Sequence, residues 1–255
     1  MSQGPRLRAI ETGGGEGPPL VLLHGFDGRA EAFDGIAAGF AAEGRRCLAF
    51  DLPGHGGSRD FPGFGPPKVA ARAVIGELAA RGIEAAHVVG HSMGGAVACL
   101  IALFEPRLVL SLTLLAPGGF GPEIGLEPIR AVMAARDETS LAAALRTMTA
   151  PDFTLPPHAT RGNNGPGGRD EIRQIFGPMF GSGRQGVLPL DAVAASDRPI
   201  ELLWGEADPV TPVSESENLP PAFAVTRLPG VGHMLMLEAP EAVSAAIRRA
   251  IARAG

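Results

Sequence analysis

Residues 90–95 have the sequence Gly-His-Ser-Met-Gly-Gly, in which Ser92 is a candidate catalytic nucleophile. The apolar run at 86–89 is predicted to be a buried strand, and residues 94–101 are predicted to form a helix packed back onto it. A serine between such a strand and helix must occupy a sharp turn. A glycine two residues before it and another two residues after it let the strand and the helix pass closely. This geometry lifts the serine hydroxyl out of the sheet.

Two polar residues further along the chain could complete an acid–base system with Ser92. Asp208 follows an apolar strand predicted at 199–203, and His233 follows a strand predicted at 224–228. In open α/β sheets the catalytic loops meet at the carboxyl ends of the strands, so these side chains should lie near Ser92. The order serine, aspartate, histidine also differs from the orders in the chymotrypsin and subtilisin folds. Glu206 is the alternative to Asp208 as the acid.

Together these segments resemble the α/β-hydrolase superfamily over nearly the whole chain. Residues 20–26, Leu-Val-Leu-Leu-His-Gly-Phe, are similar to that family's third strand and its His-Gly oxyanion loop. Residues 51–58 are similar to the loop after its fourth strand. The resemblance implies an α/β fold with a mostly parallel central sheet flanked by helices, and it implies structural roles for His24 and His55.

The same resemblance assigns chemical roles. Ser92 would attack an acyl carbonyl while His233 takes its proton, and Asp208 would hold the imidazole in the required tautomer. The product of this half-reaction is an acyl-enzyme. The negative charge on the carbonyl oxygen would be stabilised by the backbone N–H groups of Phe26 and Met93.

The alternation of strands and helices is interrupted in the middle of the chain. Residues 1–118 and 198–255 are predicted to form the hydrolase core, and residues 119–197 a helical cap inserted before the acid loop. Within the cap we expect helices at 126–148 and 170–180, separated by a turn-rich break at 161–168.

Caps in this family cover the substrate pocket. Several large apolar side chains could line that pocket: Met133, Met148, Phe153, Phe176, Met179, Phe180 and Met234. The alternative is that these residues pack the cap against the core, as buried methionine and phenylalanine commonly do.

A serine at position 92 narrows the reaction, because dehalogenases and epoxide hydrolases of this fold have aspartate there. Hydrolysis of an ester or thioester, acyl transfer, hydrolysis of a carbon–carbon bond and cofactor-free perhydrolysis remain open. Our principal expectation is a carboxylesterase-like serine hydrolase that acts on a small acyl substrate. A hydrolase-fold receptor that binds a ligand without steady turnover is an alternative from a different class.

A finer resemblance supports a second candidate activity. Residues 114–124 and 232–240 are similar to segments of the hydrolase-like acyltransferase part of acetoin dehydrogenase E2 components. That family carries an N-terminal lipoyl domain, whereas here the hydrolase core is expected to start almost at once. The corresponding hypothesis is an acyltransferase that receives its acyl group from a separate thiol carrier.

Composition excludes several other classes. A net charge of -5 without a basic run makes nucleic acid an unexpected partner. The sequence contains no apolar segment of the length expected for a secretory signal or a membrane span, so we expect a cytoplasmic protein. No histidine or cysteine pair has metal-ligand spacing, and no metal or cofactor is expected. The sequence does not indicate an oligomeric state.

Overall fold

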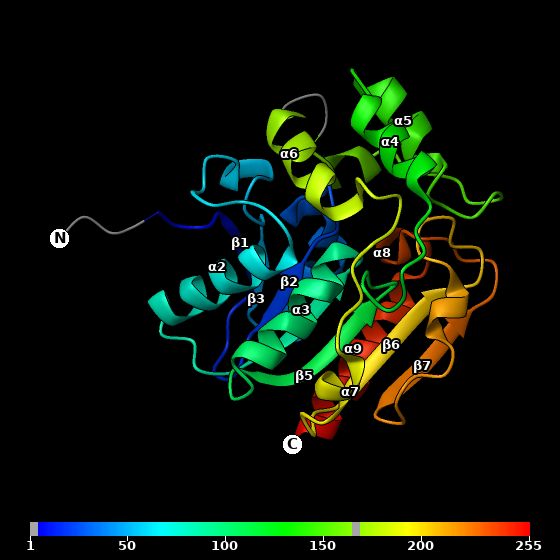
Figure 1. Cartoon of the computed structure of the whole chain (residues 1–255). Helices are drawn as coiled ribbons and strands as arrows, with labels where there is room; N and C mark the ends of the chain where they lie inside the picture. Colours follow the sequence, from blue (N-terminus) through cyan, green and yellow to red (C-terminus); the bar gives the residue numbers. More distant parts are fainter. Residues whose placement is uncertain (1–4, 165–168) are drawn as a thin grey trace.

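The computed structural model describes residues 5–164 and 169–255, and its centre is a seven-stranded sheet (Figure 1). The strand order is β1-β3-β2-β4-β5-β6-β7, and every neighbouring pair is parallel except β1 and β3. The fold class predicted from the sequence is therefore confirmed. The strands are β1 (Ala9–Thr12), β2 (Leu20–Leu23), β3 (Cys47–Phe50), β4 (Ala86–His91), β5 (Val109–Leu115), β6 (Ile200–Gly205) and β7 (Phe223–Leu228).

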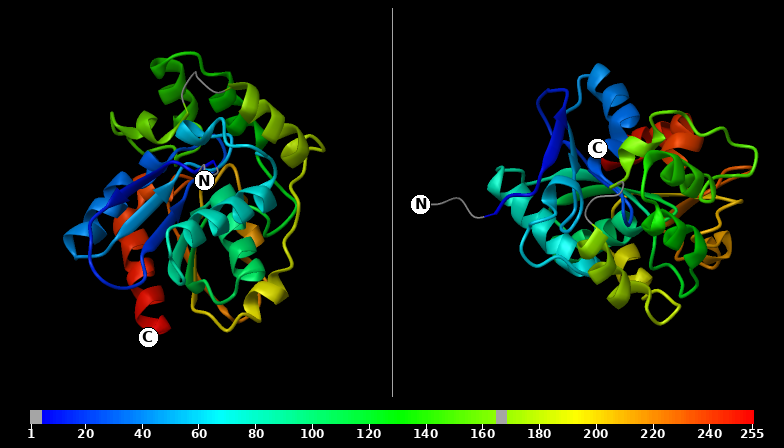
Figure 2. Two further views of the ribbon diagram at one scale, coloured as in Figure 1. Left: turned by 90° about the vertical axis from the view of Figure 1, so that its left-hand side faces the viewer. Right: turned by 90° about the horizontal axis from the view of Figure 1, so that it is seen from above.

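Helices cover both faces of this sheet (Figures 1 and 2). One face is covered by α1 (Asp34–Ala42) and α9 (Pro240–Ala254), and the other by α2 (Pro67–Ala80), α3 (Met93–Phe104) and α7 (Leu190–Ala194). Every residue of β2, β3 and β4 is buried, which explains why these strands are almost continuously apolar. Shorter helical turns are η1 (Ala30–Phe33), η2 (Gly56–Ser58), η3 (Ala159–Gly162), η4 (Val213–Ser216) and α8 (Leu235–Glu238).

Three helices between β5 and β6 stand above the carboxyl ends of the strands (Figures 1 and 2). They are α4 (Leu126–Ala134), α5 (Glu138–Arg146) and α6 (Arg169–Phe180). The helical span predicted at 126–148 is divided in two, because Asp137 starts a new helix by accepting a hydrogen bond from the Ser140 N–H at 2.7 Å. Residues 165–168 of the predicted turn-rich break lie outside the described residues.

The cap helices share a hydrophobic cluster separate from the main core, which includes Ile129, Leu145 and Phe180. Phe120 and Val193, near the two ends of the predicted cap range 119–197, belong instead to the main core. The part that packs separately is thus narrower than that range. Among the described residues, no helix combines the length and apolar character that crossing a membrane requires.

The position of α3 depends on two glycines next to Ser92. A Cβ atom on Gly94 would overlap the carbonyl oxygen of Leu23 and lie 2.6 Å from that of His24. A Cβ atom on Gly90 would overlap the carbonyl oxygen of Gly94. The absence of side chains at these two positions lets the start of α3 press against the ends of β2 and β4.

We predict that Gly94→Ala lowers the free energy of unfolding by roughly 2 kcal/mol or more, because the atoms it meets are backbone and cannot rotate away. Urea denaturation measures the change. Gly76→Ala is the matched control, since Gly76 lies inside α2 with nothing within 4 Å of the added Cβ atom. It should stabilise the protein by about 0.5–1 kcal/mol. Equal effects of the two substitutions would contradict this account of the turn.

Candidate active site

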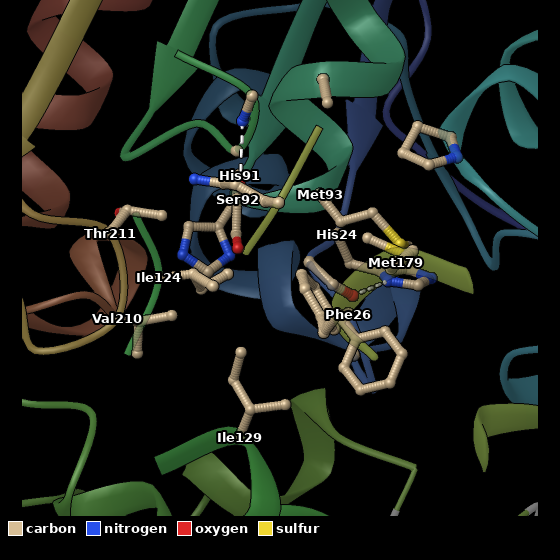
Figure 3. Close-up of a pocket in the computed structure, with 18 of the residues that line it drawn as sticks. His24, Phe26, His91, Ser92, Met93, Ile124, Ile129, Met179, Val210 and Thr211 are labelled. Atoms are coloured by element: carbon tan, nitrogen blue, oxygen red, sulfur yellow. Dashed lines mark hydrogen bonds between the residues drawn. The ribbon is translucent and has the colours of Figure 1, made fainter. Parts of the chain in front are cut away.

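Ser92 has the backbone conformation expected of a serine on a sharp strand-to-helix turn. Its φ is 52° and its ψ is -119°, a left-handed conformation that is unfavourable for a side chain. The surrounding backbone holds it there: the Ser92 N–H donates to the carbonyl of Leu115 at 2.9 Å, and the Ser92 carbonyl accepts from Gly118 at 2.9 Å. Figure 3 shows Ser92 at the centre of a pocket, between Thr211 on one side and Met93 and Met179 on the other.

His233 and Asp208 form a buried hydrogen-bonded pair. The Nδ1 atom of His233 donates to Oδ2 of Asp208 at 2.8 Å, and the two side chains are 3% and 0% exposed. The Thr211 hydroxyl donates to the same carboxylate oxygen at 2.8 Å, and the other oxygen accepts the N–H groups of Val210 and Thr211. These hydrogen bonds fix the orientation of the Asp208 carboxylate, with Oδ2 directed at the imidazole of His233. Glu206, the alternative acid, is exposed.

These hydrogen bonds determine the ionisation of Asp208. Burial alone would raise its pKa, but His233 and the two backbone N–H groups outweigh that cost and hold the pKa below its usual value. The loops that carry the pair are joined to each other, because the Ala207 N–H donates to the carbonyl of Val231 at 2.9 Å. The indole N–H of Trp204 donates to the carbonyl of Thr211 and fixes the far end of the acid loop.

The two predicted oxyanion donors lie next to Ser92. Met93 is the first residue of α3, so its N–H has no partner within the helix. Phe26 and Met93 both line the pocket with Ser92. The loop that carries Phe26 passes so close that a Cβ atom on Gly25 would lie 3.1 Å from the Cβ atom of Ser92.

Histidines hold this loop in place. His24 Nδ1 donates to the carbonyl of Gly25 at 2.7 Å, and its Nε2 accepts the Leu52 N–H at 3.0 Å. His55 Nε2 accepts the N–H of Asp27 at 3.2 Å, and its Nδ1 donates to the carbonyl of Pro53 at 3.0 Å. Each of these rings donates through one nitrogen and accepts through the other, which only a neutral imidazole can do.

His91 contacts His233, the candidate catalytic histidine. Its Nε2 donates to the carbonyl of His233 at 2.9 Å, and the two rings lie 4.7 Å apart. Burial and the neighbouring His233 lower the pKa of His91 to about 3. Burial also lowers the pKa of His24, that of His55 to about 3 and that of His87 to about 4. Near neutral pH all four are therefore uncharged.

Glu238 connects the His233 loop to the cap. Its Oε2 atom accepts the N–H of Gly232 at 2.7 Å and that of Ala150 at 2.8 Å, and its Oε1 accepts the N–H of Met234 at 2.9 Å. The N–H of His233 itself donates to the carbonyl of Met148 at 2.8 Å. One carboxylate thus binds both neighbours of His233 together with the segment that follows α5.

The sequence analysis did not identify Thr211 or Glu238. Thr211 lies three residues after Asp208, a spacing at which an aspartate commonly accepts the backbone N–H of the later residue. That spacing is a signal that could have been used. Glu238 gives no comparable signal, because its partner Ala150 lies 88 residues away in the chain and nothing in the local sequence indicates that contact.

Ser92 and His233 open onto a cavity of about 290 Å³ between the core and the cap. Its lining is mostly apolar and includes Ile124, Ile129 and Val210, which lie on one side of Ser92 in Figure 3. Four of the predicted pocket residues line it: Met148, Met179, Phe180 and Met234.

The other three predicted pocket residues do not line this cavity. Met133 and Phe176 pack against the cap cluster, and the ring of Phe176 lies 5.5 Å from that of Phe180, which does face the cavity. Phe153 is half-buried in the loop after α5. Met133 and Phe176 therefore pack the cap, which was the alternative to lining the pocket.

Comparison with known proteins places the chain in a family. Residues 20–246 match the sequence profile of the alpha/beta hydrolase family, and the chain belongs to it. It is 34% identical over 234 residues to a pimeloyl-[acyl-carrier protein] methyl ester esterase from Chromobacterium violaceum, covering 82% of this chain and 84% of that protein. The curated and structural relatives bear out the resemblance found in the sequence.

Two further relatives complete the comparison. A dihydrolipoyllysine-residue acetyltransferase component of an acetoin cleaving system from Pseudomonas putida is 34% identical over 249 residues, covering 94% of this chain but 65% of that protein. The chain thus spans just under two thirds of this relative. The structure of a meta-cleavage product hydrolase from Pseudomonas fluorescens IP01 superimposes with a TM-score of 0.82 at 20% identity, covering 98% of this chain and 96% of that one, and shows the shared fold.

We predict that Glu238→Ala lowers kcat at least tenfold on any substrate that the Ser92 site turns over, because both neighbours of His233 lose their acceptor. Hydrogen bonds to a charged group contribute about 1.5–3 kcal/mol each, so the free energy of unfolding should fall as well. Steady-state kinetics and urea denaturation measure the two effects. Glu238→Gln keeps one acceptor oxygen and should fall between Ala and wild type.

Glu241→Ala is the control for this experiment. Glu241 lies three residues further on, in the first turn of α9, and is exposed. Its substitution should leave kcat unchanged. If Glu238→Ala also kept a wild-type kcat, Glu238 would have no part in positioning His233.

The neutral histidines predict a dependence of stability on pH. Since the folded pKa values of His55, His87 and His91 lie below the unfolded value near 6.5, the unfolded chain binds more protons as the pH falls. Their contribution is fully present above about pH 6.5 and is lost toward the folded pKa values, by up to about 1.4 kcal/mol per pH unit for each ring.

Urea denaturation between about pH 7 and pH 5, where most carboxylates stay ionised, measures this slope. His87→Gln should reduce the slope by about one proton, because the His87 ring is buried away from the other three and bonds only to Ser111 among the described residues. His158→Gln, which removes a histidine at an exposed position, is the matched substitution for comparison. A flat profile in wild type would contradict the assignment of neutral buried rings.

Proposed function

We propose that this protein is a serine hydrolase that cleaves a carboxylic ester or thioester of a small acyl substrate through an acyl-enzyme on Ser92. The observation that carries the proposal is the buried pair of His233 and Asp208, in which His233 lines the same cavity as Ser92. A neutral imidazole bonded through Nδ1 to a carboxylate leaves Nε2 free to accept a proton.

In the first half-reaction the Ser92 hydroxyl oxygen bonds to the acyl carbon as its proton passes to His233. The resulting imidazolium is stabilised by the carboxylate of Asp208. The oxyanion accepts the N–H groups of Met93 and Phe26, and each such donor contributes about 3 kcal/mol. When the tetrahedral intermediate collapses, His233 returns the proton to the departing alcohol or thiol, and the acyl group stays on Ser92.

In the second half-reaction water takes the place of the alcohol. His233 accepts a proton from the water as its oxygen bonds to the acyl carbon, and the same oxyanion donors stabilise the second intermediate. Collapse returns the proton to Ser92 and releases the acid. The apolar cavity supports this chemistry, because exclusion of bulk water strengthens the interactions on which both intermediates depend.

The similarity to an esterase over 82% of the chain supports ester cleavage. Similarity to the acetoin-system component over 94% of the chain favours a second candidate, an acyltransferase that receives its acyl group from a separate thiol carrier. Both candidates form the same acyl-enzyme on Ser92 and differ in whether water or another acceptor takes the acyl group. Carbon–carbon bond hydrolysis, perhydrolysis and ligand binding without turnover remain further alternatives.

The test is steady-state release of p-nitrophenol from a series of acyl esters, acetate to decanoate, by wild type and Ser92→Ala. We expect many turnovers in wild type and a fall of at least a thousandfold in the variant, since the nucleophile is lost. The best chain length would measure the acyl part of the cavity.

Other outcomes separate the alternatives. Release that stops near one equivalent and resumes when an acyl acceptor other than water is added would favour the acyltransferase. Equal inertness of wild type and Ser92→Ala on every ester would reject ester hydrolysis and favour carbon–carbon cleavage, perhydrolysis or binding.

A further inference from the structure

The cavity at Ser92 has a single charged wall residue. Lys68 lines it, whereas no aspartate, glutamate or arginine does so among the described residues. Lys68 is also the only lysine in the chain. It is exposed, and the described part of the structure gives it no ion pair. A lone cation on the wall of a mainly apolar cavity provides a partner for an anionic group of whatever binds there.

The lining of this cavity includes one face of α3 as well as Lys68, and we refer to the part of the cavity between Ser92 and Lys68 along that face as its arm. Met93, Ala96 and Leu100, three successive lining residues, lie on one face of α3 at intervals of three and four. The eight residues from Ser92 to Leu100 correspond to about 12 Å along the helix axis. The arm can therefore accommodate an extended chain attached to Ser92.

The packing of α2 beside α3 places Lys68 near Leu100. The guanidinium of Arg72 lies 5.3 Å from the centre of the Phe104 ring, which joins the two helices one turn further along each of them (Figure 1). Lys68 and Leu100 lie four residues before these partners on their respective helices. The cation therefore stands about two helical turns from the nucleophile.

This arm lies away from the histidine. The leaving group must be within reach of His233, whose surroundings in the cavity are Val210, Thr211 and Met234. In Figure 3 Val210 and Thr211 lie on the opposite side of Ser92 from Met93. The acyl half of a substrate then extends along the α3 face and ends at Lys68.

We propose that the preferred acyl group is a medium-length chain with a carboxylate at its far end, which binds Lys68. This inference rests on the proposed ester hydrolysis and adds its substrate class. The carboxylate would leave the apolar part of the arm and reach the exposed ammonium, so that neither charge is buried without a partner. A neutral chain of equal length would bind the same apolar wall but leave the cation without an anion.

The test compares two series of p-nitrophenyl esters. One contains the monoesters of adipic, suberic and sebacic acids, and the other the esters of hexanoic, octanoic and decanoic acids. We expect wild type to have a higher kcat/KM for the charged ester at the best length, by about five- to tenfold, as is reasonable for one partly solvated ion pair. The preference should shrink at high salt, which screens the pair.

Substitutions of Lys68 test whether this residue causes the preference for the charged ester. Lys68→Met should abolish the charged-to-neutral ratio, and Lys68→Arg, which keeps the charge, should retain most of it. Arg72→Met is the matched control, because it removes an exposed cation of the same helix that does not line the cavity. It should leave the ratio at its wild-type value.

The outcomes separate this inference from the proposed function. Ser92-dependent hydrolysis with the same ratio in wild type and Lys68→Met would overturn the carboxylate site and leave the esterase intact. A ratio lost equally in Arg72→Met would assign the preference to general surface charge and would also overturn it. Failure of both ester series in wild type would overturn ester hydrolysis, and this inference with it.

Discussion

The close approach of α3 to the ends of β2 and β4 is the constraint on which the candidate site depends. Gly94 touches the carbonyls of the strand that leads into the oxyanion loop, and Gly90 touches Gly94 itself. The chain between them has no room for an ordinary turn, so Ser92 takes a positive φ. One steric condition thereby places Ser92, the proposed nucleophile, close to the first N–H groups of α3 and to the Phe26 loop.

The parallel sheet brings Asp208 and His233 to the same edge as Ser92. Ser92 follows β4, Asp208 follows β6 and His233 follows β7, and parallel strands bring their carboxyl ends to one edge. The cap is attached to this edge by hydrogen bonds to Glu238 as well as by apolar contacts. A displacement of the segment after α5 would therefore act on the His233 loop directly, because both are hydrogen-bonded to Glu238.

Local sequence predicted the parts of the molecule that local rules determine. Alternating apolar strands and helices, and the glycines around Ser92, indicated the fold and the nucleophile turn. The prediction of one continuous helix over 126–148 was wrong, because the side chain of Asp137 caps a new helix inside that span. Among the apolar cap residues, Met133 and Met148 have the same chemistry, yet only Met148 lines the cavity. The face of each cap helix is set by packing against the core, which spacing along the chain does not reveal.

The charges around the cavity suit the proposed reaction, in which a single negative charge forms on the substrate at each step. The four buried histidines other than His233 are neutral, so none of them adds a positive charge that would compete with His233 for the carboxylate of Asp208. Asp208 itself is ionised by its partners, and its charge is available to the imidazolium when that forms. The oxyanion is left to backbone dipoles, which need no reorganisation. Among the described residues Lys68 is the one formal cation on the wall, about two helical turns from Ser92, so the substrate selection proposed for it would not perturb the proposed proton transfers at Ser92.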